Sequence, residues 1–168
     1  MPGVMNARKL ALELLKQFDE KRGTLEALLD RFLNRGGLDR RDRRFVYQLV
    51  HGTLRHRIRL RHTVRHHLTD AELGGKLELM RILELGAYQI LHMDRVPNHA
   101  AVSESVNLAK ASPATRRFTG VVNAVLRAVI RTRGQVPLPD SKTDLAGRLA
   151  LEYAHPLWMV QRWLQRYG

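Results

Sequence analysis

Apolar residues recur at intervals of three and four positions through most of this chain, which is the period of an α-helix. No segment alternates apolar and polar residues over the length of a strand. The sequence therefore predicts an all-α protein of about seven to nine helices with essentially no strand. The expected helices cover about residues 5–20, 25–33, 39–68, 79–90, 98–110, 112–130 and 144–152, with a last one after Pro156.

Capping residues predict where several of these helices begin. Thr24, Asp39, Asn98 and Ser112 can each act as an N-cap, and Pro113 strengthens the last of these predictions. The pair Gly36-Gly37 is expected to end the second helix, so that the first two helices form a hairpin.

Two helices are candidates for the interior. The small pair Gly86-Ala87 predicts a close helix crossing on a helix that is nearly all buried. The helix over 112–130 has the widest apolar face, and we expect it at the centre of the core.

Positive charge is concentrated in one part of the chain. The formal net charge is +13, and residues 39–67 alone contain nine Arg and two Asp. Residues 113–132 add four Arg and no acid, whereas 68–112 carry a small negative excess. A GC-rich genome would explain why Arg outnumbers Lys, but it would not explain this clustering. The clustering favours a polyphosphate partner, nucleic acid above all.

A cationic stripe is expected along the helix over 39–68. On a helical wheel its members fall within about 60° of one another. They are Arg41, Arg44, Gln48, Arg55, Arg59, His62 and His66. The candidate RNA-binding residues are the charged and histidine members of this stripe together with Arg8, Arg116 and Arg117. The alternative is that the stripe is only the solvated face of an amphipathic helix.

Three points about these basic helices stay open. Arg57 and Arg61 project toward the apolar side, so either they extend to the surface or the helix bends near Gly52. The sequence does not decide whether the basic helix that carries Arg116 and Arg117 faces the same side as the stripe. Tyr47 and Tyr88 could stack on bases, although tyrosines on apolar helices more often fill cores.

Several kinds of site are not expected in this chain. It contains no Cys, no G-x-G-x-x-G, no phosphate-binding P-loop and no G-x-S-x-G. His62 and His66 have the spacing of zinc ligands but no obvious third ligand. We expect no catalytic, cofactor or metal site here. The sequence has no signal-peptide pattern and no membrane span, which favours a cytoplasmic protein without a membrane partner.

Several motifs resemble those of a known family. The segment from Asp42 to Arg55 resembles the third helix of the NusB family. The segments Leu85–Leu91, Met93–Pro97, His99–Val102 and Val122–Arg127 resemble the NusB-like N-terminal domain of bacterial rRNA cytosine-5 methyltransferases of the RsmB (Sun/Fmu) family. The resemblance implies two small helical bundles over residues 1–133, with a short helical C-terminal extension over 134–168.

The extension, with Tyr153–Trp158 and Arg162–Leu164, is similar to the segment that leads toward the catalytic part of that methyltransferase family. The resemblance implies an RNA-binding domain that docks and orients rRNA for a catalytic domain in cis. That domain, not this chain, would bind S-adenosylmethionine and supply catalytic cysteines. Two alternatives remain, a NusB-type transcription antitermination module and a protein-interaction domain that uses the aromatic extension. The oligomeric state is left open.

Overall fold

A computed structural model describes residues 6–20, 23–35 and 38–168. In these ranges the chain forms eight α-helices, two short 3₁₀ helices and no strand. The α-helices are α1 (Ala7–Asp19), α2 (Leu25–Arg35), α3 (Arg40–His66), α4 (Leu77–His92), α5 (Asn98–Ala111), α6 (Thr119–Thr132), α7 (Leu145–Glu152) and α8 (Leu157–Tyr167). The 3₁₀ helices are η1 (Ala71–Gly75) and η2 (Arg116–Phe118). The all-α prediction is confirmed, while the predicted stop at Gly36-Gly37 lies outside the described residues.

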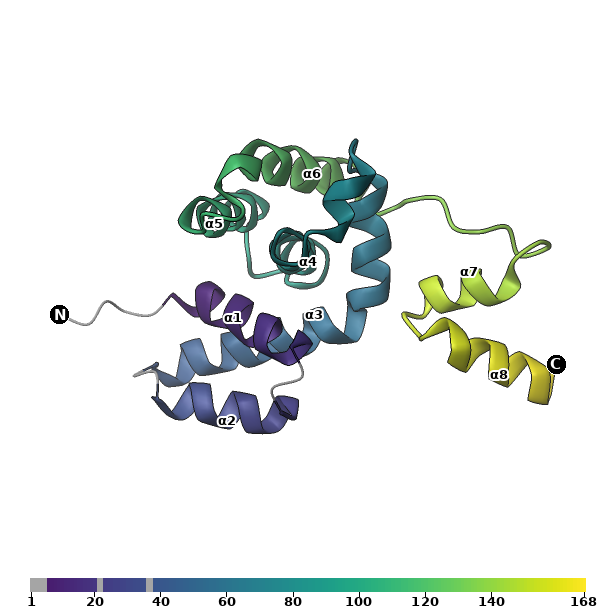
Figure 1. The fold of residues 1–168 in the computed structure, drawn as a ribbon, viewed down its shortest axis with the longest axis horizontal. Helices are drawn as coiled ribbons and strands as arrows, with labels where there is room; N and C mark the ends of the chain where they lie inside the picture. The colour runs from purple at the N-terminus through teal and green to yellow at the C-terminus, as the bar shows by residue number, and fades with distance from the viewer. Residues whose placement is uncertain (1–5, 21–22, 36–37) are drawn as a thin grey trace.

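Helix α4 occupies the centre of the fold. It packs against α1 and α3 on one side and against α5 and α6 on the other (Figure 1). Its residues from Leu79 to Gln89 are all buried. The expectation that the helix over 112–130 would be central is wrong, because α6 buries only one side and leaves Arg127 and Arg131 in solvent.

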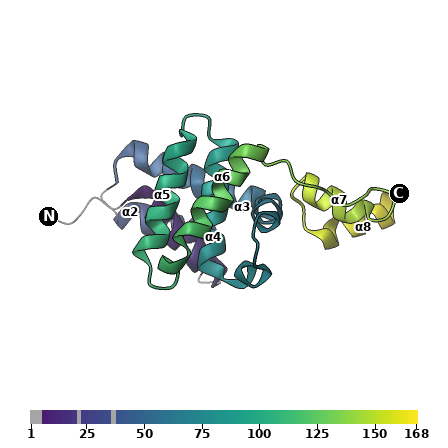
Figure 2. The same ribbon diagram turned by 90° about the horizontal axis from the view of Figure 1, so that it is seen from above.

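One hydrophobic core extends through the helices α1 to α6. Buried side chains from each of α1 to α6 belong to the same apolar cluster, to which α7 and α8 contribute none of the described residues. The helices α7 and α8 pack against each other and stand to one side of the domain at the end of a linker (Figures 1 and 2). No described helix has both the length and the apolar character needed to cross a membrane.

The predicted close crossing at Gly86 is confirmed. A Cβ atom on Gly86 would lie 2.6 Å from Leu126 Cδ1 and 2.7 Å from Ser105 Oγ. Both neighbours are buried, and the Ser105 hydroxyl is held by a hydrogen bond to the Ala101 carbonyl. Glycine at this position therefore lets α5 and α6 approach the middle of α4.

The capping predictions have mixed outcomes. The N–H groups of Ala27 and Asp42 donate to Thr24 and Asp39 side chains, as expected. Asn98 is instead the first residue of α5, with Pro97 at the cap. Ser112 does not begin a helix; it follows the end of α5, and its carbonyl accepts from the N–H groups of Thr115 and Arg116. This turn delays the start of α6 until Thr119.

Helix α3 changes direction along its length, so that its two halves border different parts of the domain (Figure 1). The ring of Tyr88 lies against α3 at Gly52, where a Cβ atom would sit 1.9 Å from Tyr88 Cζ. Tyr88 is buried, which agrees with a role in the core, whereas Tyr47 is 52% exposed. A single straight helical wheel therefore does not describe the whole of α3.

Replacing Gly86 by Ala should destabilise the domain. The added methyl group overlaps two buried groups, and overpacking of this kind costs about 1–3 kcal/mol. Urea denaturation measures the loss as a lower transition midpoint. The control is Gly120→Ala on α6, where a Cβ atom would meet nothing within 4 Å. If both variants unfold at the same urea concentration, the crossing at Gly86 is looser than described.

Candidate nucleic-acid interface

The free cations of the stripe are concentrated before the last three turns of α3. Arg41, Arg44 and Arg55 are exposed and make no hydrogen bond or ion pair with the described residues. Asp39 and Asp42 lie nearby, but Asp39 caps the helix and Asp42 stands in its first turn. These three guanidinium groups are therefore available to an anionic partner.

The later part of the stripe is partly covered. His62 Nε2 lies 2.9 Å from the carbonyl oxygen of Pro137, so the linker after α6 crosses α3 at this point. Arg59 is half-buried, and its Nη1 is buried without a hydrogen-bond partner. Helix α7 also packs against α3 (Figure 1). His66 is exposed, with its ring edge toward His67.

Of the other candidate residues, Arg8 lies on α1 beside α3, and Arg116 and Arg117 lie in η2. Arg8 is engaged within the fold, where its Nε donates to Gln89 Oε1 at 2.7 Å and its guanidinium lies over the Phe45 ring. Burial lowers the pKa of Arg8, although the charge of Glu104 acts in the opposite direction. Arg8 thus fastens α1 to α3 and α4.

Arg116 and Arg117 are exposed in η2, which packs against α5 and α6. Arg116 Nε donates to the Lys110 carbonyl, and Arg117 lies over the Phe118 ring. The first half of α3 and helix α6 are on opposite sides of the domain, with α1 and α4 between them (Figure 1). The structure therefore separates Arg116 and Arg117 from Arg41 and Arg44.

The side chains of Arg57 and Arg61 belong to a buried network of charged groups. Arg57 Nη1 donates to Asp19 Oδ1 at 2.9 Å, and Arg61 Nε donates to Glu84 Oε1 at 3.0 Å. Arg81 of α4 donates to both carboxylates. The network joins α1, α3 and α4, and the side chain of Glu84 has no solvent exposure. The arginines thus neither extend freely to the surface nor lie against apolar groups alone.

Burial and the neighbouring charges shift the pKa values of the arginines in this network. Burial alone would lower the pKa of Arg81, but its hydrogen bond to Asp19 and the charge of Glu84 raise it above its ordinary value. Burial and the neighbouring Arg81 lower the pKa of Arg57. Arginine stays charged through shifts of this kind, so the two carboxylates are held between cations.

Asp19 and Glu84 were not among the residues predicted from the sequence to have a particular role. One signal was present, because Arg81 and Glu84 stand three residues apart on a helix that was expected to be nearly all buried. Charged residues are seldom buried without a partner, so the pair already required additional partners from neighbouring helices.

A stack of aromatic rings joins α3 to the end of α4. The rings of His56 and His92 are stacked with centroids 4.2 Å apart, and Tyr88 lies 5.4 Å from His92. Burial lowers the pKa of both histidines, and the charge of Arg55 contributes at His56. A lowered pKa favours the neutral form of both rings, and neutral rings stack without charge repulsion. No pattern in the sequence pointed to this stack.

The comparisons identify the family. Residues 5–131 match the NusB family, a span that covers most of the chain. The chain belongs to the NusB family. A transcription antitermination protein NusB of Bifidobacterium longum subsp. infantis is 31% identical over 83% of this chain and 75% of its own length.

This NusB-family chain is also similar to longer proteins. It is 30% identical to a probable ribosomal RNA small subunit methyltransferase B of Bacillus subtilis, over 97% of the chain and 36% of the relative. It is 33% identical to the protein of the same name from Synechocystis, over 98% of the chain and 36% of the relative. The chain thus spans little more than a third of these methyltransferase relatives.

Replacing Glu84 by Gln should destabilise this NusB domain strongly. The substitution keeps the shape but removes the carboxylate that Arg61 contacts and leaves Arg57 and Arg81 to share Asp19. Breaking a buried ion pair costs about 3 kcal/mol or more. Urea denaturation followed by circular dichroism measures the loss.

The control is Glu78→Gln on the same helix, which removes a carboxylate 3.5 Å from Lys16 Nζ near the surface. Such a pair contributes only about 1 kcal/mol or less. Equal losses in the two variants would show that the buried network does not hold α1, α3 and α4 together.

Proposed function

We propose that this domain binds structured ribosomal RNA and orients it for a methyltransferase domain in the same polypeptide. The observation that carries the proposal is the set of exposed arginines on α3, Arg41, Arg44 and Arg55, which have no acidic partner among the described residues. Guanidinium groups placed along one helix can follow a phosphate backbone, which fixes the register of the RNA without reading its sequence.

The names of the relatives support the substrate class. The Bacillus subtilis and Synechocystis proteins are named as ribosomal RNA small subunit methyltransferases, and the match with each includes almost all of this chain. Binding by this domain would supply position, and the chemistry would belong to the part of the relatives that this chain does not span. That part would bind S-adenosylmethionine and provide the nucleophile.

Two observations on α7 and α8 support the proposal that a catalytic domain belongs to the same polypeptide. The NusB-family match ends at residue 131, whereas the methyltransferase matches extend over 97–98% of the chain and therefore include these helices. Among the residues that the structure describes, eight large apolar side chains are exposed, and six of them lie in this part of the chain: Leu145, Tyr153, Leu157, Trp158, Trp163 and Tyr167. We assign residues 1–133 to RNA binding and 134–168 to contact with the catalytic domain.

A second candidate is a transcription antitermination module. The Bifidobacterium NusB protein is as similar in identity as the methyltransferases, and the match covers 75% of its length. The coding sequence after residue 168 distinguishes the two functions. Continuation into a domain with a nucleotide-binding fold and paired cysteines supports the methyltransferase function, and a stop codon supports the antitermination module.

The exposed arginines of α3 should determine the salt dependence of RNA binding. The triple variant Arg41→Gln, Arg44→Gln, Arg55→Gln should bind fragments of small-subunit rRNA more weakly. The slope of log K against log salt should become shallower by about two, since each lost phosphate contact contributes roughly 0.7–0.9. Fluorescence anisotropy at several salt concentrations measures this slope.

The matched control removes three exposed arginines elsewhere, Arg95→Gln, Arg162→Gln and Arg166→Gln, with the same change in net charge. If this control loses as much slope as the α3 variant, binding follows net charge and α3 is only a solvated face.

The 168-residue chain should bind rRNA but transfer no methyl group from S-adenosylmethionine. Methylation of cytosine at C5 needs a nucleophile at C6, and the chain contains no Cys to supply a thiolate. Incorporation of labelled methyl groups into unmodified rRNA, compared with a protein-free sample, measures this. Methyl transfer by the chain alone would contradict the proposal.

Adding a catalytic domain as a separate chain should restore methylation through the aromatic face of α7 and α8. The variant Trp158→Ser with Trp163→Ser should weaken that restoration without changing RNA binding. The control is Leu77→Ser, an exposed apolar residue of α4. If methylation is restored as fully in the double tryptophan variant as in the parent, this face is not the contact with the catalytic domain.

A further inference from the structure

An exposed aromatic ring stands among the arginines of α3 that have no acidic partner. Outside residues 134–168, the exposed large apolar side chains among the described residues are those of Tyr47 and Leu77, and Tyr47 is the aromatic one. Its side chain is 52% exposed. The core therefore uses only part of this ring and leaves a face of it available to a partner.

The ring of His51 lies against the ring of Tyr47. Their centroids are 4.1 Å apart, and the ring planes are inclined by 35°. The two residues are four positions apart on α3, which makes them neighbours on one side of the helix. The contact restricts the Tyr47 ring before any partner arrives, so less conformational entropy is lost on binding.

Two exposed arginines border the pair of rings. Arg44 precedes Tyr47 by three residues and Arg55 follows His51 by four, so both lie on the side of α3 that carries the rings. The two arginines are about 16 Å apart along the helix axis, with the rings between them. The only acid of α3, Asp42, stands in its first turn. The surface is thus a cation, two rings and a second cation in succession.

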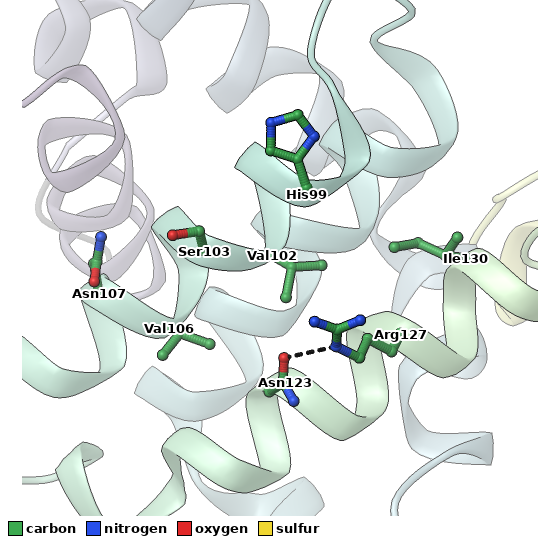
Figure 3. A pocket seen from close by; sticks show the side chains of 8 residues that line it. All are labelled: His99, Val102, Ser103, Val106, Asn107, Asn123, Arg127 and Ile130. Atoms are coloured by element: carbon green, nitrogen blue, oxygen red, sulfur yellow. Dashed lines mark hydrogen bonds between the residues drawn. The ribbon is translucent and has the colours of Figure 1, made fainter.

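Other parts of the domain lack this combination. A hollow of about 410 Å³ between α5 and α6 has His99 as the one ring among its described lining residues, and that ring is not stacked on another (Figure 3). The stack of His56 and His92 includes Tyr88, but Tyr88 is buried against Gly52. Among the described residues of α1 to α6, an exposed tyrosine beside free arginines occurs at Tyr47 alone.

We propose that Tyr47 and His51 form a platform on which an unpaired base of the bound RNA stacks, while Arg44 and Arg55 hold the phosphates on either side of that base. The inference rests on the RNA-binding function proposed above and specifies which kind of RNA the α3 surface takes. That RNA is a loop, bulge or single strand, because the bases of a continuous duplex are stacked on one another and cannot reach a protein ring.

The order of groups along α3 favours a nucleotide over a peptide. Every base has a flat face that can stack on an aromatic ring, and a phosphate lies on each side of it along the strand. An acidic peptide would use Arg44 and Arg55 but would offer no flat group to Tyr47. A purely apolar peptide would use the rings and leave the guanidinium groups unpaired.

The test changes the ring without changing the charge. Tyr47→Leu removes the flat ring and keeps an apolar side chain, whereas Tyr47→Phe keeps the ring and removes the hydroxyl group alone. The matched control is Tyr167→Leu on α8, an exposed tyrosine with the Arg166 guanidinium over its ring. Both tyrosines are exposed, so the fold should not change, and circular dichroism and thermal melting verify this.

Two RNA ligands are compared by fluorescence anisotropy at several salt concentrations. One is a hairpin with an unpaired loop, taken from small-subunit rRNA. The other is the same hairpin with abasic sites throughout the loop, which keeps every phosphate and removes the loop bases. The pair of ligands separates contacts with bases from contacts with the backbone.

Tyr47→Leu should bind the intact hairpin about tenfold more weakly than the parent, because stacking of one base on an aromatic side chain is worth at least that much. Tyr47→Phe and Tyr167→Leu should bind it as the parent does. The slope of log K against log salt should stay that of the parent, since no phosphate contact is removed. The abasic hairpin should bind the parent and Tyr47→Leu equally.

The remaining outcomes distinguish this inference from the proposed function. If the triple arginine variant loses salt dependence while Tyr47→Leu binds the intact hairpin as the parent does, the function stands and the platform is refuted. An equal loss for the abasic hairpin would show that Tyr47 supports the helix instead of stacking on a base, which also overturns the inference. If the parent binds neither hairpin, the proposed function fails and the platform fails with it.

Discussion

The placement of Glu84 on the buried helix α4 is the constraint on which the rest of the domain depends. A carboxylate without solvent exposure is tolerated only when cations and hydrogen-bond donors surround it. Arg81 from the same helix and Arg57 and Arg61 from α3 fill that requirement, and Asp19 of α1 balances the excess positive charge. Because these charged groups come from three helices, the network fixes how α1 and α3 sit on α4.

The same constraint divides the arginines of α3 into two groups with different roles. Arg57 and Arg61 turn inward to the carboxylates and are used for stability. Arg41, Arg44 and Arg55 have no carboxylate partner among the described residues and remain exposed to solvent. The linker at Pro137 and helix α7 then cover part of the later stripe, at His62 and Arg59. A count of positive charges in this helix would therefore overestimate the surface that RNA can reach.

Two surfaces result, and each has a different chemistry. The first half of α3 offers exposed guanidinium groups, and α7 with α8 offers exposed aromatic rings. This separation suits a domain that holds RNA on its body and a protein partner on its extension. The NusB-family match ends at residue 131, before α7 and α8, whereas the methyltransferase matches cover 97–98% of the chain.

The sequence by itself determined where most helices lie, because the helical period and side-chain caps depend on residues close together in the chain. Thr24 and Asp39 cap their helices as expected. The small residue Gly86 also marked the close helix crossing. The sequence also determined that a cationic surface exists on α3. Only the tertiary structure decided which arginines form that surface, since the direction of Arg57 depends on Asp19, which is 38 residues away. It also decided that α4 rather than α6 is central and that Ser112 closes a turn. These outcomes depend on contacts between helices far apart in the chain, and local periodicity carries no information about such contacts.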